Sequence, residues 1–282
     1  MYNRHLNPTK AGTPQGGIIS QILANMTLDG MEEAIASRYH VGKNREIDKR
    51  RYNPHKVNFA RYADDFVVTA DSEETAEDLA EVVKEFLKER GLELSEEKTH
   101  ITHIDDGFDF LGWNFRKYKG KLLIKPFRKS IGKVTRKISD VIKRAKAWKQ
   151  EDLINALNPI IIGWSNYHRS VVSKEVFSKL DNIVWNMLWR WVKRRHPDKS
   201  KTWILRKYWH SEGTRSWVFS TKKNRLKRFS DTKIVRHIGL KLDKNPYLDL
   251  KYFKLRKLRQ KALKLNAWYK TRWDKLKDGL CA

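Results

Sequence analysis

The sequence predicts an α+β fold, in which a small antiparallel sheet with helices on one face precedes a mainly helical, strongly basic region. Two observations predict it. Strand-like and helix-like apolar runs alternate over the first 126 residues. Charge is also divided unevenly, because residues 1–110 hold 14 Lys+Arg and 21 Asp+Glu (net −7), whereas residues 111–282 hold 46 and 12 (net +34). An acidic region therefore precedes one that suits a polyanion, most plausibly nucleic acid.

Two helices are predicted in the acidic region. An apolar pattern from Ser20 to Ile35 has helical spacing, with Ser20 as a candidate N-cap. A second helix has a cap and acidic first turn at residues 71–74, an apolar stripe from Leu79 to Leu87, and an end at Gly91.

The strands of this region follow from shorter patterns. Apolar runs at 57–60 and 66–70 flank a tight turn, and residues 92–103 alternate in a way that suits a strand. A further hairpin is predicted over residues 108–124, with its turn at Lys119-Gly120.

The basic region should be helical at 129–148, 151–170 and 174–195, although Pro159 would end or kink the second helix unless it lies in a first turn. Beyond residue 200, tryptophans alternate with Lys and Arg; we expect most tryptophans to be core. Residues 250–277 are dense in Lys, Arg and Leu, which predicts a helix lying along DNA or RNA. The resulting domains are 1–126, 127–200 and 201–282.

The tetrapeptide Tyr62-Ala63-Asp64-Asp65 is the most informative feature. A tight strand-turn-strand places both acids at a hairpin tip, where their charges repel unless cations lie between them. Paired Mg²⁺ ions that bridge carboxylates and phosphate oxygens are usual in nucleotidyl transfer. The alternative is an ordinary acidic turn, because Asp is common in hairpin loops.

Composition limits the remaining classes. Forty per cent hydrophobic residues suffice for ordinary cores, and a single cysteine, Cys281, excludes an internal disulfide framework. Neither a secretion signal nor a membrane span is visible, so we expect an intracellular, cytoplasmic protein with no membrane partner.

Four blocks in order resemble the reverse-transcriptase segments of group II intron-encoded proteins, and a fifth resembles their maturase region. They are Gly12-Thr13-Pro14-Gln15-Gly16-Gly17 with Ile18 to Asn25, Arg61 to Asp65, Gly91 to Thr99, Phe110-Leu111-Gly112-Trp113, and Leu157-Asn158-Pro159 with Gly163-Trp164-Ser165-Asn166-Tyr167. The resemblance implies a partial polymerase palm followed by a helical thumb and a basic maturase region.

The resemblance assigns catalytic roles residue by residue. Asp64 and Asp65 would bind the catalytic Mg²⁺ ions, and Lys98 would protonate the departing pyrophosphate, its alternative being a solvated surface charge. The remaining roles are a pocket for the templating base and incoming deoxynucleotide (Gln15, Gly16, Gly17), a primer-end contact (Tyr62), hairpin support or a phosphate contact (Arg61), and a primer-gripping hairpin (Phe110, Leu111, Gly112, Trp113).

One departure from the family pattern matters. A palm of this kind takes a third carboxylate from a strand upstream of the glycine loop, and only eleven residues precede Gly12. We therefore expect an N-terminally truncated enzyme that does not polymerise alone and that needs a palm and fingers fragment in trans.

The basic region should bind the intron RNA and assist splicing. Its candidate contacts are Lys193, Arg194, Arg206, Lys207, Arg215, Lys222, Lys223 and Arg225. Expected partners are intron RNA, a DNA target or primer, and deoxynucleotides, within a ribonucleoprotein. A non-enzymatic RNA-binding splicing factor and the remnant of a decayed mobile element are the alternatives.

Overall fold

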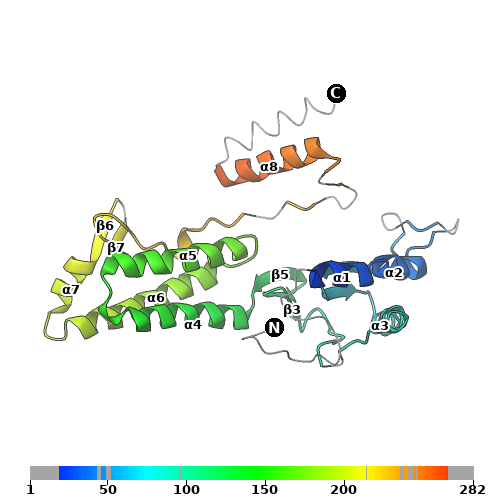
Figure 1. Cartoon of the computed structure of the whole chain (residues 1–282), viewed down its shortest axis with the longest axis horizontal. Coiled ribbons are helices and arrows are strands. Elements are labelled where there is room, and N and C mark those ends of the chain that lie inside the picture. The colour runs from blue at the N-terminus through cyan, green and yellow to red at the C-terminus, as the bar shows by residue number, and fades with distance from the viewer. Residues whose placement is uncertain are drawn as a thin grey trace. The chain divides into compact units, whose positions relative to one another are not determined.

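The computed structural model describes residues 19–42, 46–48, 52–95, 97–213, 215–235, 238–240, 244–245 and 247–265. Contacts divide the chain into two units, Met1–His103 (unit 1) and Ile104–Ala282 (unit 2). Each unit mixes helices with small antiparallel sheets, so the predicted α+β class is confirmed (Figure 1). No helix in the described ranges has a stretch long and apolar enough to span a bilayer.

Unit 1 packs its helices around a two-stranded hairpin. The elements in order are α1 (Ser20–Thr27), α2 (Met31–Tyr39), β1 (Asn58–Tyr62), β2 (Asp65–Thr69) and α3 (Glu73–Lys88). Their core is a small cluster to which α2 contributes Met31 and Ile35, and α3 contributes Leu79 and Val83. Burial of these apolar side chains stabilises the contact between the two helices.

The second predicted helix is confirmed as α3. Ser72 is its N-cap, because the Ser72 hydroxyl accepts a hydrogen bond from the Thr75 amide at 3.2 Å. After the last turn, the Leu92 amide donates to the carbonyl of Leu87, and Gly91 takes a left-handed φ of +67°.

Three predictions in unit 1 are wrong. The pattern from Ser20 to Ile35 is two helices instead of one, because the chain turns at Gly30, whose φ of +86° no helix accepts; Ile19 instead of Ser20 is the N-cap residue. The described part of residues 92–103 contains no strand. Amides 98 and 99 both bond to the Ser95 carbonyl, so a local turn takes the groups that a strand would offer to a partner.

Unit 2 joins a three-stranded sheet to a helical bundle and a second hairpin. The elements in order are β3 (Phe108–Phe110), β4 (Trp113–Tyr118), β5 (Lys121–Pro126), α4 (Arg128–Arg144), η1 (Ala145–Ala147), α5 (Gln150–His168), α6 (Lys174–Arg195), α7 (Lys201–Tyr208), β6 (Trp209–Glu212), β7 (Arg215–Phe219), η2 (Phe229–Asp231) and α8 (Leu250–Leu265). The predicted hairpin is confirmed as β3-β4-β5, with positive φ angles at both Lys119 and Gly120 in the second turn.

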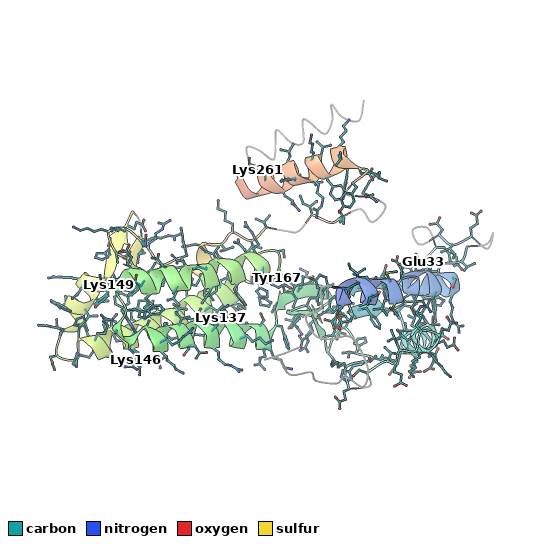
Figure 2. The ribbon with its side chains drawn as sticks, in the orientation of Figure 1. Glu33, Lys137, Lys146, Lys149, Tyr167 and Lys261 are labelled. Carbon is teal, nitrogen blue, oxygen red and sulfur yellow. The ribbon has the colours of Figure 1, made fainter. Side chains whose placement is uncertain are left out.

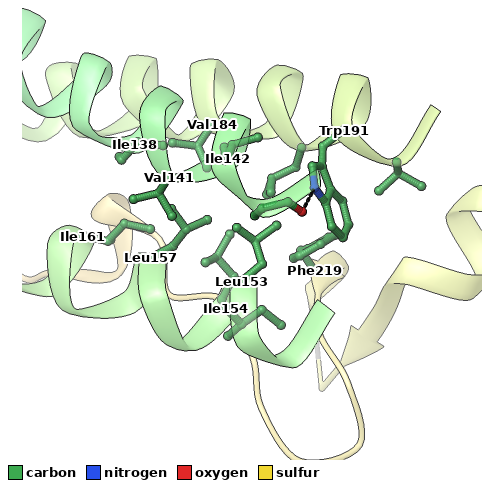
Figure 3. Packing of buried hydrophobic residues seen from close by; sticks show 14 of the residues in the cluster. Ile138, Val141, Ile142, Leu153, Ile154, Leu157, Ile161, Val184, Trp191 and Phe219 are labelled. Carbon is green, nitrogen blue, oxygen red and sulfur yellow. Dashed lines mark hydrogen bonds between the residues drawn. The ribbon is translucent and has the colours of Figure 1, made fainter. Parts of the chain in front are cut away.

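The core of unit 2 lies between α4, α5 and α6. Figure 3 shows Ile138, Leu157 and Val184 packed together, with the Trp191 indole donating a 2.8 Å hydrogen bond to the Ala145 carbonyl. Phe219 of β7 belongs to the same cluster, so the second hairpin shares this core. The sequence-based division at 126 and 200 stays a prediction, because shared packing does not test where functional segments begin.

Two expectations for unit 2 need revision, and a third is confirmed over its described part. Pro159 does not end α5, because Leu157 and Ile161 on either side of it are buried and tertiary packing outweighs the lost backbone bond. Of the described tryptophans beyond residue 200, Trp209 is buried whereas Trp203 and Trp217 are 37% and 50% exposed, so the expectation that most of them are core is wrong. The predicted helix at 250–277 is present as α8 up to Leu265, and its remainder lies outside the described residues.

Candidate functional site

The Asp64–Asp65 pair lies at the tip of the β1-β2 hairpin. Tyr62 pairs with Asp65 as the last register position, which leaves Ala63 and Asp64 as a two-residue turn. Ala63 takes a φ of +56° to close that turn. Both carboxylates are exposed, and so is Tyr62, at 67% of its surface. The hairpin therefore presents two adjacent acids and a phenol to solvent.

Arg61 holds this tip through two hydrogen bonds. Its guanidinium donates to the Ala63 carbonyl at 3.2 Å and to the Asn25 side chain of α1 at 3.1 Å. The first bond holds the turn, and the second ties the hairpin to the helix that follows the glycine loop. Of the two roles expected for Arg61, these bonds favour support of the hairpin. A phosphate contact remains a prediction.

The other residues assigned to unit 1 are less well defined. Lys98 is exposed in the turn that follows Ser95. Gln15, Gly16 and Gly17 lie outside the described residues. The pocket for the templating base therefore stays a prediction, as does the role of Lys98.

The donor set at the hairpin tip fits Mg²⁺ in part. Mg²⁺ is a hard cation that typically takes one or two carboxylates together with substrate phosphates and water. Asp64 and Asp65 supply two such carboxylates in accessible positions. Within the described ranges, no group of three or more His, Cys, Asp or Glu side chains gathers to hold a metal by itself. A metal at this tip would depend on further ligands.

The predicted primer grip is the turn between β3 and β4. Leu111 and Gly112 form it with φ angles of +48° and +80°. The Tyr167 hydroxyl of α5 donates to the Leu111 carbonyl at 2.6 Å, and the Tyr167 ring stacks on Trp113 with centroids 5.0 Å apart. The Phe127 amide donates to the Gly112 carbonyl. The end of α5 thus holds this turn by hydrogen bonding and stacking.

A buried histidine extends this attachment. The Trp113 indole donates to Nδ1 of His168 at 3.1 Å, so Nδ1 is an acceptor and the ring proton lies on Nε2. Nε2 then donates to the Ser130 hydroxyl at 3.2 Å, and the Trp164 indole donates to the same oxygen. Burial lowers the pKa of His168 to about 4 and keeps it neutral. We call these four residues the His168 relay.

Sequence reasoning missed what the maturase signature does in the fold. The Asn158 amide side chain donates to the Arg225 carbonyl at 3.0 Å and accepts from the Lys227 amide at 2.8 Å. Ser165 accepts from the Thr232 hydroxyl at 2.9 Å. Helix α5 therefore holds the segment that follows β7 (residues 220–235, called here the connector) as well as the grip turn. The available signal was chemical: Asn and Ser inside an apolar helix carry hydrogen-bonding groups that require partners.

The eight basic residues expected to bind RNA are all exposed on unit 2. Some also make local contacts. Arg215 forms an ion pair with Asp231, Arg225 pairs with Glu212 at 2.9 Å, and Lys207 lies 4.7 Å above the Trp203 ring. Further exposed lysines, which the sequence did not single out, project from the bundle and are labelled in Figure 2: Lys137, Lys146 and Lys149.

An acidic hairpin tip and a turn held by a neighbouring helix fit the predicted polymerase palm, and the exposed basic residues of unit 2 suit a polyanionic partner. Comparison with known families agrees. Residues 2–115 match the reverse transcriptase (RNA-dependent DNA polymerase) family, and residues 131–209 match the group II intron maturase-specific domain. Together the two matches support a group II intron reverse transcriptase/maturase, which confirms the resemblance. Reverse transcriptases of this family are generally Mg²⁺-dependent.

Several curated proteins are similar to parts of the chain. Protein YkfC of Escherichia coli strain K12 is 35% identical over 122 residues, covering 36% of this chain and 31% of that protein. The ribosomal operon-associated A protein of Euglena longa is 30% identical over 126 residues, covering 44% and 24%. The group II intron-encoded protein LtrA of Lactococcus lactis subsp. cremoris is 30% identical over 165 residues, covering 41% and 27%. The matches span less than a third of each relative.

Proposed function

We propose that this chain is the RNA-binding and primer-gripping part of a group II intron reverse transcriptase/maturase. Unit 2 binds folded intron RNA and stabilises it for splicing, while the RNA supplies the splicing chemistry. The observation that carries this proposal is the exposure of all eight candidate basic residues on a unit rich in Lys and Arg. Cations there neutralise phosphates, and exposed indoles stack on bases.

The Asp64–Asp65 pair supports a second activity, RNA-directed DNA synthesis for intron mobility. Metal ions bound there would align the attacking and leaving oxygens of nucleotidyl transfer. Two carboxylates hold such ions incompletely, and the described residues place no third one beside them. We therefore propose that the 282 residues polymerise only when a palm and fingers segment adds the missing ligand in trans. A purely RNA-binding splicing factor is the second candidate function, and the same incomplete donor set favours it.

The splicing role is tested by adding the purified chain to a candidate group II intron at low Mg²⁺ concentration, where the RNA alone splices poorly. We expect faster splicing with the wild-type chain and with an Asp64→Ala, Asp65→Ala double variant. Splicing that the chain leaves unchanged, together with no binding to the intron, would refute the RNA-binding proposal.

The polymerase role is tested by Mg²⁺-dependent primer extension on an RNA template, with and without a palm and fingers segment from a relative. We expect extension only in the combined sample, and loss of extension in the Asp64→Ala, Asp65→Ala double variant. Extension by the chain alone would show that the third ligand comes from within these 282 residues. Extension that survives the double substitution would refute the metal role of the pair.

A further inference from the structure

A cavity of about 390 Å³ opens in unit 2 beside the β6-β7 hairpin, and no residue of the grip turn or of the His168 relay lines it. Helix α6 lines one side with Trp185 and Asn186, the hairpin contributes Trp217, and the connector after it contributes Lys227 and Arg228. We call this cavity the Trp217 pocket. None of the roles proposed above for this chain involves this cavity.

Aromatic surface in this pocket faces solvent instead of the core. Trp185 stacks in parallel on Trp189, with centroids 5.6 Å apart and planes 4° apart, yet remains 37% exposed. Trp217 is 50% exposed. Trp209, which is buried, lies 6.0 Å from Trp185 and backs the pair. Flat, rigid, accessible indoles of this kind are surfaces on which nucleobases stack.

The backbone at Trp217 is strained. Its φ of +65° lies in the left-handed region, which is a clear outlier for a bulky residue. The Arg228 guanidinium donates to the Trp217 carbonyl at 3.3 Å and helps to hold this conformation. The next two residues, Val218 and Phe219, are buried, so the strained residue brings an exposed indole next to a chain segment that returns to the core. Strain of this type is retained where surrounding structure enforces it, and it clusters at binding sites.

Polar groups beside the indoles suit a base and its phosphate. Asn186 donates to the side-chain oxygen of Asn182 at 2.7 Å, so the bond uses one donor and one acceptor and leaves further amide groups at the wall. Lys227 and Arg228 add positive charge. The one carboxylate, Asp181, accepts from the backbone amides of residues 229 and 230 at 2.8 and 3.1 Å, so its oxygens are already engaged by the fold.

We propose that the Trp217 pocket binds one unstacked nucleobase of a single-stranded RNA segment, seated against the indoles of Trp185 and Trp217. Positive charge favours RNA over an apolar protein segment as the occupant, because the chain beyond residue 110 contains 46 Lys+Arg but only 12 Asp+Glu. The proposal rests on the proposed RNA-binding function and deepens it. Phosphate contacts alone would hold any strand, whereas this pocket makes binding depend on the base itself.

The test measures binding of the full chain to two probes of equal length and charge, a short single-stranded oligoribonucleotide and its abasic counterpart. Stacking on an aromatic side chain predicts that the wild-type chain prefers the base-bearing strand by roughly five-fold or more. Trp217→Gly removes the indole and relieves the strain, because glycine accepts positive φ. Trp185→Ala removes the second exposed indole that lines the cavity, which comes from α6 instead of the hairpin.

We expect both variants to bring the preference toward one while binding of the abasic strand stays unchanged. Trp148→Ala is the matched control, since Trp148 is 39% exposed but lies outside the pocket. An unchanged preference in Trp217→Gly and Trp185→Ala, or the same loss in Trp148→Ala, would overturn the proposal. If the wild-type chain binds intron RNA but does not prefer the base-bearing strand to the abasic one, the pocket proposal fails and the proposed function stands. If it binds neither intron RNA nor the oligoribonucleotide, both proposals fail.

Discussion

The two units hold their candidate functional residues in opposite ways. Unit 1 presents Asp64 and Asp65 on an isolated pair of half-buried strands above a cluster of 8 buried residues, whereas the described core of unit 2 comprises 21. A two-stranded hairpin is marginal without support. Unit 2 instead fixes its grip turn with bonds to the end of α5, a helix that packs into the larger core. Metal binding at the acidic tip would therefore depend on further ligands, whereas the conformation of the grip turn is already fixed by hydrogen bonds within unit 2.

The largest contrast should appear when one buried leucine is removed from each core. Leu157→Ala in unit 2 should cost about 2–5 kcal/mol, and Leu79→Ala in unit 1 should fall at the lower end of that range, because a small core relaxes more easily around a cavity. Both leucines are nearly inaccessible, at 0% and 3% exposure. Hydrogen exchange read by mass spectrometry reports the two units separately. An equal decrease of protection in both units from either substitution would show that the units unfold together.

The His168 relay should make unit 2 sensitive to acid. The pKa of His168 is about 4 in the folded chain and near 6.5 in the unfolded chain, so between these pH values the unfolded state binds one more proton than the folded state. The stability present above pH 6.5 should fall by on the order of 1 kcal/mol per pH unit as pH decreases toward 4. In His168→Gln this contribution is absent, because glutamine does not titrate.

The measurement is the difference in unfolding free energy between wild type and His168→Gln as a function of pH. We expect a constant difference above about pH 7 and a shift in favour of the variant below pH 6.5. A difference that stays constant down to about pH 4.5 would show that His168 takes up its proton without unfolding.

The charge contrast between the units should appear in the salt dependence of RNA binding. Lys222 and Lys223 are exposed in unit 2, and replacing both with Ala should reduce the slope of log affinity against log salt by roughly one for each phosphate that is no longer neutralised. The matched control is Lys84→Ala, Lys88→Ala on α3 of unit 1. A reduced slope in the control would place the RNA on both units.

The smallest effect should come from Tyr167→Phe. The change removes only the hydroxyl that donates to the Leu111 carbonyl and keeps the ring on Trp113, so it should cost about 0.5–1.5 kcal/mol. Faster amide exchange confined to residues 108–115 would agree. Exchange that speeds equally in α4 and α6 would show that Tyr167 stabilises the bundle as a whole.

Features that are set by residues close together in the sequence could be predicted from the sequence. The Ser72 cap of α3 and the Lys119-Gly120 turn follow from residue types within one turn of chain. The break at Gly30 was missed because the apolar spacing continues across it. The strand expected at 92–103 failed because alternation says nothing about whether a pairing partner exists.

The candidate site divides along the same line. Asp64 and Asp65 could be recognised because their chemistry lies in one tetrapeptide. The long-range bonds made by α5 join residues 34 to 70 positions apart, as with Trp164 and Ser130 or Gln150 and Ser220, and no local pattern carries that information. Tryptophan exposure was misjudged because Trp is amphipathic, and composition does not show which indoles remain accessible.

The His168 relay also bears on modularity. Family comparison divides the chain into a segment ending at residue 115 and another beginning at 131. The relay crosses that boundary, with Trp113 on one side and Trp164 and His168 on the other. A chimaera joined between the two segments would combine His168 and Tyr167 of one protein with the β3-β4 turn and the residue at position 113 of another, so these bonds would have to form between unmatched partners. Exchange of either segment between relatives should therefore succeed only when the bonding partners on the other side of the junction are exchanged with it.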